Sequence, residues 1–248
     1  FKETYNVLKE KHDKPRFIMT LSITNHPPYR LPKDVEIQKI KLDEKTLGRF
    51  PYDNTETIFA TFRYANDELG KFINAVKEDV SLKDNIFIAA TGDHNMRGIG
   101  YSDYPEELVF GHEVPFYLYM PEKYIRNTAV RYDPKRLGSH KDIITTLVSH
   151  AVSDYTFYSF GCDMLSNDKC NFPYAYNQSV SVGYGKDYAC ELQTDNYGVS
   201  YKITDRKQLL VSPKADDANC TKEAAFKKLE AQLYYFQAMM PVKLEKTK

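Results

Sequence analysis

The spacing of apolar positions predicts helices and strands through the first two thirds of the chain. From Thr55 to Val80, apolar residues recur at steps of three and four, which is typical of an amphipathic helix. Shorter helices are expected over residues 3–11, 142–152 and 221–239. Apolar runs bounded by turn-forming residues predict strands over residues 16–22, 86–90 and 114–120.

The order of these elements predicts an α/β fold. A strand at 16–22, a helix at 55–80 and a strand at 86–90 have the order of a βαβ unit, in which the strands are parallel and the crossover is right-handed. Such units build layered α/β/α sheets. The five apolar residues that begin at Ile86 are typical of a strand buried in a parallel sheet.

The pattern changes after residue 160. Segments in which apolar and polar residues alternate, at 179–183, 197–203 and 208–212, predict a small antiparallel sheet with one solvent-exposed face. A last helix follows, and we interpret its apolar stripe as core packing; the stripe consists of Phe226, Leu229, Leu233, Phe236 and Met240. The expected organisation is therefore an α/β domain over residues 1–160 and an α+β subdomain over residues 161–248.

Composition narrows the function classes. Basic and acidic residues balance at 34 each, and the basic ones are not gathered in a stripe, which argues against nucleic-acid binding as the main function. No apolar run approaches the roughly 20 residues that span a bilayer. The chain begins at Phe1 without an initiator Met, and we interpret it as part of a longer protein.

Four cysteines lie in the C-terminal part of the chain, and none belongs to a Cys-x-x-Cys pair, which argues against a zinc ribbon. Their clustering in a loop-rich segment suggests two disulfides and an oxidising compartment. The sequential pairing, Cys162–Cys170 with Cys190–Cys220, is one of three connectivities. Four free buried thiols are the alternative.

Candidate chemistry lies beside the predicted strands. Asp93 and His94 directly follow the strand at 86–90, and ligands of open α/β sheets bind beyond strand ends. A carboxylate and an imidazole both suit Zn²⁺ or Mn²⁺, so the pair is half of a metal site, unless Asp93 only caps a turn. His26 lies in a loop after the strand at 16–22. His112 precedes its strand, and would reach the site only if the loop before it folds back.

Four segments together resemble one family. They are residues 20–29 (TLSITNHPPY), 64–73 (YANDELGKFI), 85–94 (NIFIAATGDH) and 112–121 (HEVPFYLYMP). In this order and spacing they resemble the sulfatase branch of the alkaline phosphatase superfamily. The likeness covers about residues 15–165 and is closest to phosphoglycerol transferases of the lipoteichoic acid synthase type and to phosphoethanolamine transferases.

The resemblance implies a role for each matched residue. Asp93 and His94 would be ligands of a divalent cation, Mn²⁺ or Zn²⁺, with Mg²⁺ and Ca²⁺ as further candidates. His26 and His112 would be catalytic, acting on the transferred phosphoryl group. Substrate contacts would come from His26, Asn25 and His140.

Two departures from the family pattern bear on activity. Asn95 replaces the Gly that commonly follows the Asp-His pair. No Cys here begins the Cys-x-Pro-x-Arg run of formylglycine sulfatases, and the Thr nucleophile and the acidic ligand of the transferases would lie upstream of Phe1. The chain is therefore expected to be the C-terminal half of a catalytic domain, inactive by itself.

The function implied by the resemblance is metal-dependent transfer of a phosphoglycerol-type group. The donor would be an anionic phospholipid and the acceptor a glycan or a lipid. The catalytic domain would lie on the periplasmic or extracellular side of a cell membrane, anchored by N-terminal helices outside this sequence. The alternatives are a sulfuric-ester hydrolase, a phosphoethanolamine transferase, and a non-catalytic relative that kept the fold.

Overall fold

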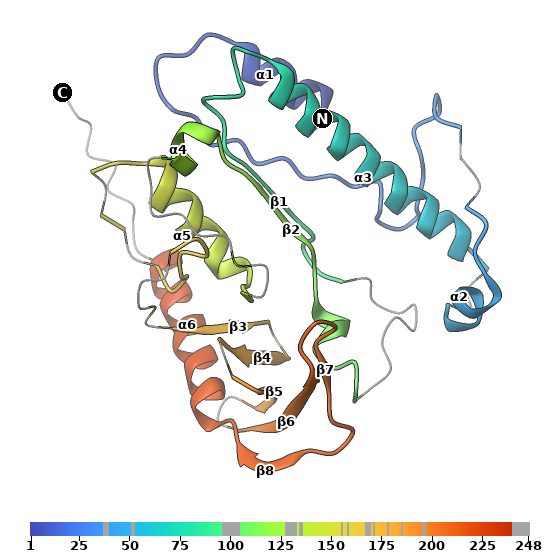
Figure 1. Ribbon diagram of the computed structural model, residues 1–248, viewed down its shortest axis with the longest axis vertical. Helices are drawn as coiled ribbons and strands as arrows, with labels where there is room; N and C mark the ends of the chain where they lie inside the picture. Colours follow the sequence, from blue (N-terminus) through green and yellow to red (C-terminus); the bar gives the residue numbers. More distant parts are fainter. Residues whose placement is uncertain are drawn as a thin grey trace. The chain divides into compact units, whose positions relative to one another are not determined.

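The computed structural model describes residues 1–36, 40–50, 53–95, 105–126, 133, 136–154, 156–157, 159–166, 170, 172–177, 179–184, 186–194 and 197–239 (Figure 1). The chain divides into two compact units. Unit 1 comprises residues 1–91, 96–101 and 116–128, and unit 2 comprises 92–95, 102–115 and 129–248. Among the described helices, none is long and apolar enough to cross a membrane.

Unit 1 is built around the predicted long helix, α3 (Thr55–Glu78). Its C-terminal half buries Ile73 and Val76 against Leu82 and Ile88. The N-terminal helix α1 (Lys2–Lys9) packs against the same core through partly buried apolar side chains. Polar contacts fix this packing, because the Tyr5 hydroxyl and the Lys9 ammonium group both donate to Asp79, at 2.7 and 2.6 Å.

Two short helices complete unit 1. α2 (Glu44–Arg49) lies in a segment for which no regular element was predicted, and Asp43 caps it by accepting a 2.7 Å hydrogen bond from the Thr46 amide. Next to it, Phe50 and Ile58 form a small buried cluster. α4 (Glu122–Arg126) directly follows Pro121, which ends the preceding strand region.

The strand pair of unit 1 corrects the predicted parallel arrangement. β1 (Ile88–Thr91) pairs antiparallel with β2 (Phe116–Tyr119), and Thr91 lies opposite Phe116. The apolar run at 86–90 was interpreted as a parallel strand because it does not alternate. Three of the four β1 residues are only partly covered or exposed, so this run does not mark burial on both faces.

The strand predicted over residues 16–22 is absent from the described structure. The segment is extended but joins no strand ladder, so it does not complete a βαβ unit with α3 and β1. The apolar residues at alternate positions point outward: Phe17, Met19, Leu21 and Ile23 are 74%, 81%, 72% and 76% exposed. Apolar residues do alternate along this segment, but no neighbouring strand in the described residues covers their side chains.

Unit 2 contains the predicted antiparallel sheet, with more strands than the sequence indicated. β3 (Tyr174–Tyr176), β4 (Val180–Gly183), β5 (Tyr188–Thr194), β6 (Tyr197–Asp205) and β7 (Leu210–Val211) are neighbours in that order, and β8 (Asp216–Asn219) also pairs with β6. Apolar side chains of the sheet bury Leu108 and Val109, which precede the 3₁₀ turn η1 (Phe110–His112).

The structure contains the two disulfides that the cysteine clustering suggested, and it selects the sequential pairing from the three connectivities left open. Cys162 is bonded to Cys170, and Cys190 to Cys220. The second bond joins β5 to the residue before the last helix, where both cysteines are fully buried.

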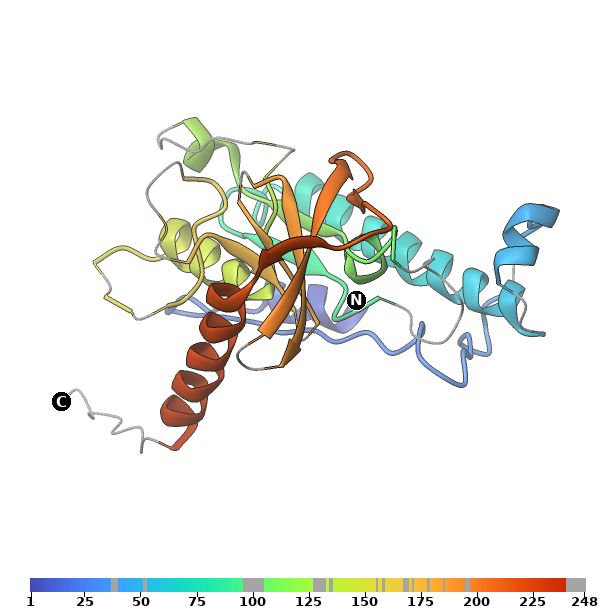
Figure 2. The same cartoon turned by 90° about the horizontal axis from the view of Figure 1, so that it is seen from below.

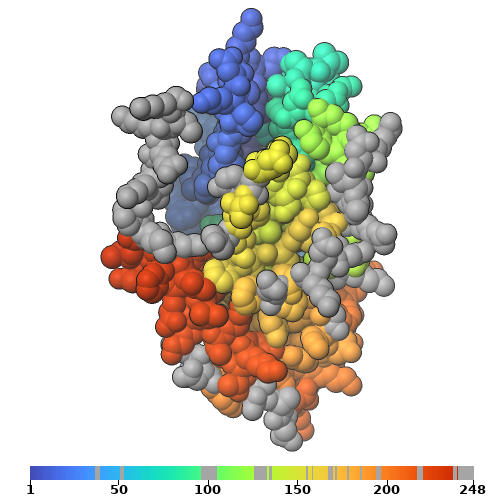
Figure 3. Space-filling model, turned by 90° about the vertical axis from the view of Figure 1, so that its left-hand side faces the viewer, coloured from blue at the N-terminus to red at the C-terminus, as the bar shows by residue number. Residues whose placement is uncertain are grey.

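The last helix, α6 (Thr221–Met239), has the predicted bounds and packs on β5 and β6 (Figures 1 and 2). The interpretation of its apolar stripe as core is wrong in part, because Leu229 and Phe236 are exposed (α6 is red in Figure 3). Among the α6 side chains that the structure describes, the buried ones are instead Glu223, Ala224 and Glu230. Met240 lies outside the described residues.

The helix α5 (His140–Ala151) matches the helix expected at 142–152 and begins two residues earlier. It belongs to the same compact unit as the C-terminal sheet. The predicted boundary at residue 160, between an α/β catalytic domain and an α+β subdomain, stays a prediction.

Candidate functional site

The turn that follows β1 carries the predicted metal ligands. Because β1 and β2 are antiparallel and Thr91 pairs with Phe116, residues 92 and 115 leave the same end of the pair. The chain between these two residues therefore returns to the end that it leaves, so the fold-back on which the prediction for His112 depended is met by the backbone.

The ring of His94 is oriented by the backbone. Its Nδ1 lies 2.7 Å from the carbonyl oxygen of Asn95. A carbonyl oxygen only accepts hydrogen bonds, so Nδ1 carries the proton and Nε2 of the neutral ring keeps its lone pair. This is the arrangement found in metal-binding histidines, whose second nitrogen donates to a carbonyl or carboxylate.

Asp93 places a carboxylate oxygen beside that lone pair. Asp93 Oδ2 lies 3.5 Å from His94 Nε2, while Oδ1 accepts a 3.0 Å hydrogen bond from the His94 amide. Two ligands bound tetrahedrally at about 2.1 Å from one ion would be roughly 3.4 Å apart. The two atoms therefore have the separation that one cation requires. Both side chains are more than half exposed, which leaves room for further ligands.

Two other segments contact this turn within unit 2. A β-carbon at Gly92 would lie only 3.3 Å from Val114 Cγ1, so the absence of a side chain allows the turn to pack on the segment after His112. His140, the first residue of α5, has its Nε2 2.8 Å from the Gly92 carbonyl oxygen. Since the carbonyl accepts, Nε2 of His140 is the donor. The turn, the His112–Val114 segment and the start of α5 thus meet at Gly92.

His26 and Asn25 lie in unit 1, on the loop after residues 16–22. The loop contains a cis peptide bond between Pro27 and Pro28, and His26 Nδ1 lies 2.8 Å from the Pro27 carbonyl oxygen, which leaves Nε2 unprotonated in the neutral ring. Asn25 Oδ1 accepts a 3.4 Å hydrogen bond from the Thr61 hydroxyl. The catalytic role of His26 and the substrate contacts of both residues stay predictions.

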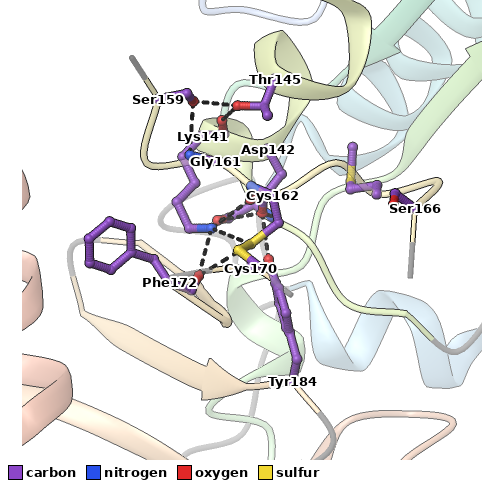
Figure 4. Close-up of a disulfide and its surroundings, with 12 residues drawn as sticks. Lys141, Asp142, Thr145, Ser159, Gly161, Cys162, Ser166, Cys170, Phe172 and Tyr184 are labelled. Atoms are coloured by element: carbon purple, nitrogen blue, oxygen red, sulfur yellow. Dashed lines mark hydrogen bonds and ion pairs between the residues drawn. A yellow bond between two sulfur atoms is a disulfide. The ribbon is translucent and has the colours of Figure 1, made fainter. Parts of the chain in front are cut away.

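A buried charged cluster at the start of α5 was not predicted as such. Ser139 and Asp142 form a capping box at the start of α5, in which Asp142 Oδ2 accepts from the Ser139 amide at 2.8 Å. The same carboxylate, fully buried, contacts Lys141 Nζ at 2.5 Å and accepts from the Tyr184 hydroxyl at 2.6 Å (Figure 4). Burial and the neighbouring Asp142 charge raise the pKa of Tyr184.

Glu230 of α6 extends this cluster. Burial raises its pKa to about 7, against the opposing effects of the Lys141 charge and a hydrogen bond with Tyr234. Part of the Glu230 population is therefore protonated at neutral pH. Sequence patterns gave no signal for this residue, because a Glu in a helix of mixed polarity is usually solvated.

A three-residue metal site is not preassembled around Asp93. Within the described ranges, the only group of three His, Cys, Asp or Glu ligand atoms that lie close together belongs to Cys190, Cys220 and Glu223. Two of these residues form a disulfide and offer no thiolate. The pair of Asp93 and His94 fits two ligands of a divalent cation in atom type and spacing, and its role as a metal site stays a prediction.

Comparison with known proteins identifies the family of this chain. The sulfatase family model matches residues 1–153, and the chain belongs to the sulfatase family. The family is enzymatic, acts on sulfate or phosphate esters and generally uses divalent metal ions. No curated protein and no solved structure matches the chain. The match covers every candidate site residue and ends before the first disulfide.

Proposed function

We propose that this chain supplies the metal-binding turn of an enzyme that transfers a phosphoglycerol-type group. The donor would be an anionic phospholipid and the acceptor a glycan or a lipid. The observation that carries the proposal is the 3.5 Å separation between Asp93 Oδ2 and His94 Nε2, together with the Nδ1 contact that orients the ring and leaves Nε2 as the ligand atom of its neutral form. An acid that only caps a turn has no need of an oriented imidazole beside it.

The donor atoms indicate the kind of ion. One carboxylate oxygen and one imidazole nitrogen suit Zn²⁺ or Mn²⁺, whereas Mg²⁺ and Ca²⁺ prefer oxygen ligands alone. A cation held there would lower the pKa of a bound hydroxyl group and neutralise charge on the phosphoryl oxygens. His140 holds the turn through the Gly92 carbonyl. His112 and His26 would donate hydrogen bonds to the anionic oxygens or protonate the leaving alkoxide.

The proposed location is the outer side of a cell membrane. Two disulfides support an oxidising compartment, since cytosolic proteins rarely keep them. A lipid donor also requires access to a bilayer surface, which N-terminal helices outside this sequence would provide.

Cation binding is the first test. Isothermal titration with Mn²⁺ and Zn²⁺ should detect binding that Asp93→Asn and His94→Ala remove. His12→Ala is the matched control, because the exposed His12 also has its Nδ1 on a carbonyl oxygen, that of Lys14, while no acidic side chain in the described part of the chain forms an ion pair with it. Unchanged affinity in Asp93→Asn and His94→Ala would refute the half site.

Turnover distinguishes the rival enzymes. With the complete catalytic domain, the proposal predicts cleavage of a glycerophosphodiester head group and negligible hydrolysis of an aryl sulfate; the reverse preference would establish a sulfatase. Cleavage only of a phosphoethanolamine donor would support that transferase, and a protein that binds cations without turnover would be the non-catalytic relative. His26→Ala should reduce turnover with the cation retained.

A further inference from the structure

The carboxylate of Asp142 is held by parts of the chain that lie beyond the family match. The match ends at residue 153. The Cys162 amide donates to Asp142 Oδ1 at 2.7 Å, and the Tyr184 hydroxyl donates to Oδ2 at 2.6 Å. Cys162 is bonded to Cys170, and Tyr184 follows β4 (Figure 4). Two elements of the C-terminal region therefore converge on one buried side chain of α5.

The segment before the disulfide follows α5 closely. The Met164 amide donates to Thr146 Oγ1 at 2.9 Å, and Asp163 Oδ2 lies 2.8 Å from His150 Nε2. A β-carbon at Gly161 would overlap the Lys141 carbonyl oxygen, so only glycine permits this approach. These contacts repeat at successive turns of the helix and fix the position of the Cys162 amide.

Asp142 connects these contacts to the candidate site. It accepts from the Ser139 amide and closes the capping box, which fixes the first turn of α5. His140 lies in that turn and donates to the Gly92 carbonyl, one residue before Asp93. Lys141 Nζ neutralises the carboxylate and also contacts the Phe172 carbonyl, close to the disulfide.

We propose that the Cys162–Cys170 disulfide and Tyr184 are positioning groups of the metal site, acting through Asp142 and His140 on the Asp93–His94 turn. The consequence for cation affinity rests on the proposed function, whereas the consequence for the His140–Gly92 hydrogen bond does not. A dithiol reductant would transfer two electrons and two protons to the disulfide, leaving two protein thiols and the oxidised dithiol. The freed loop would then hold the Cys162 amide less firmly.

The first experiment requires no metal. The carbonyl ¹³C resonance of Gly92 should shift when His140→Ala removes its hydrogen bond. Tyr184→Phe and the Cys162→Ser/Cys170→Ser double variant should each move that resonance in the same direction. The matched control is Cys190→Ser/Cys220→Ser, which removes the other disulfide of unit 2 and should leave the resonance in place.

The second experiment measures Mn²⁺ affinity. Loss of groups that orient metal ligands typically weakens binding roughly 10- to 100-fold, and we expect about tenfold in Tyr184→Phe and in the Cys162/Cys170 variant. In a His140→Ala background neither change should weaken binding further, because they share one route. A merely structural effect would instead add to that of His140→Ala.

The outcomes separate the two proposals. If the wild-type chain binds no Mn²⁺, the proposed function fails and the Gly92 resonance still decides the positioning role. If Tyr184→Phe leaves that resonance unchanged, or if the control variant shifts it equally, the positioning role is overturned. Should the double cysteine variant fail to fold, Tyr184→Phe alone decides, because it removes a single hydroxyl.

Discussion

Replacing Asp142 by Ala tests the buried cluster as a source of stability. The carboxylate is fully buried, and the Lys141 side chain beside it is 3% exposed. The substitution would leave that ammonium group without its carboxylate and would remove the acceptor of the Ser139 amide, the Cys162 amide and the Tyr184 hydroxyl. The predicted effect is therefore larger than the loss of one hydrogen bond.

The magnitude follows from the partners left behind. Removing one member of a buried ion pair costs about 3–5 kcal/mol, because the other charge stays buried. Each orphaned donor would cost about 1–3 kcal/mol if measured alone, but contributions within one network do not add. We expect a loss of about 4 kcal/mol in the free energy of unfolding. That is a large share of the roughly 5–15 kcal/mol that stabilises a typical domain.

Urea denaturation with the disulfides intact provides the measurement. With a slope of roughly 3 kcal/mol per molar urea, the midpoint should fall by more than about 1 M. Asp67→Ala is the control, since Asp67 is exposed and pairs with Arg63 at 3.6 Å, and such pairs contribute at most about 1 kcal/mol. A loss below about 1 kcal/mol in Asp142→Ala would refute the reasoning. The double change Lys141→Met/Asp142→Leu should recover much of the loss, because it removes both charges.

Three further predictions concern pH and close packing. Glu230→Gln should flatten the pH dependence of stability. The pKa of the Glu230 carboxyl rises from 4.5 to about 7 on folding, so between these values the folded protein keeps a proton that the unfolded chain releases, and wild-type stability falls as pH rises from about 4.5 to 7. Denaturation at pH 5 and pH 8 measures this difference. Asp79→Asn should reduce the loss of thermal stability below about pH 4. Hydrogen bonds from Lys9, Ser81 and Tyr5 lower the pKa of Asp79, so the folded state gains stability above the ordinary carboxyl range and loses it on acidification. Thermal melts at several pH values measure this. Gly161→Ala should destabilise the protein by at least about 1 kcal/mol, whereas Gly70→Ala, with open space around it and a helical position, should be neutral or stabilising.

Helix bounds and the presence of two disulfides were predictable because their causes are local, whereas the pairing of the cysteines was left open. α3 and α6 follow the three- and four-residue spacing, and the structure places both within about two residues of the predicted ends. The sequential disulfides join cysteines that are 8 and 30 residues apart, so short loops bring them together.

Strand partners and buried polar groups were not predictable, because they depend on residues distant in sequence. Nothing in the run from Ile86 specifies whether its neighbour is parallel, and the neighbour is β2, about 30 residues later. Asp142 resembles an ordinary capping residue until Cys162 and Tyr184 are placed on it. The same holds for Glu230, whose environment is supplied by α5.

For the candidate site, sequence reasoning supplied the residue types and the structure supplied their geometry. Asp93 and His94 were identified from their place after a strand, but the tautomer of His94 depends on the Asn95 carbonyl. The contact between His140 and Gly92 spans 48 residues and had no signal in the sequence.

The row formed by Phe17, Met19, Leu21 and Ile23 has a practical consequence for handling this polypeptide. A segment that joins no described strand ladder and exposes a row of apolar side chains is a template on which other chains can add. Concentrated samples should therefore become turbid or elute as aggregates from a size-exclusion column. Leu21→Lys, which places a charge in the middle of the row, should keep the material dispersed, and an Ala at the same position should help far less.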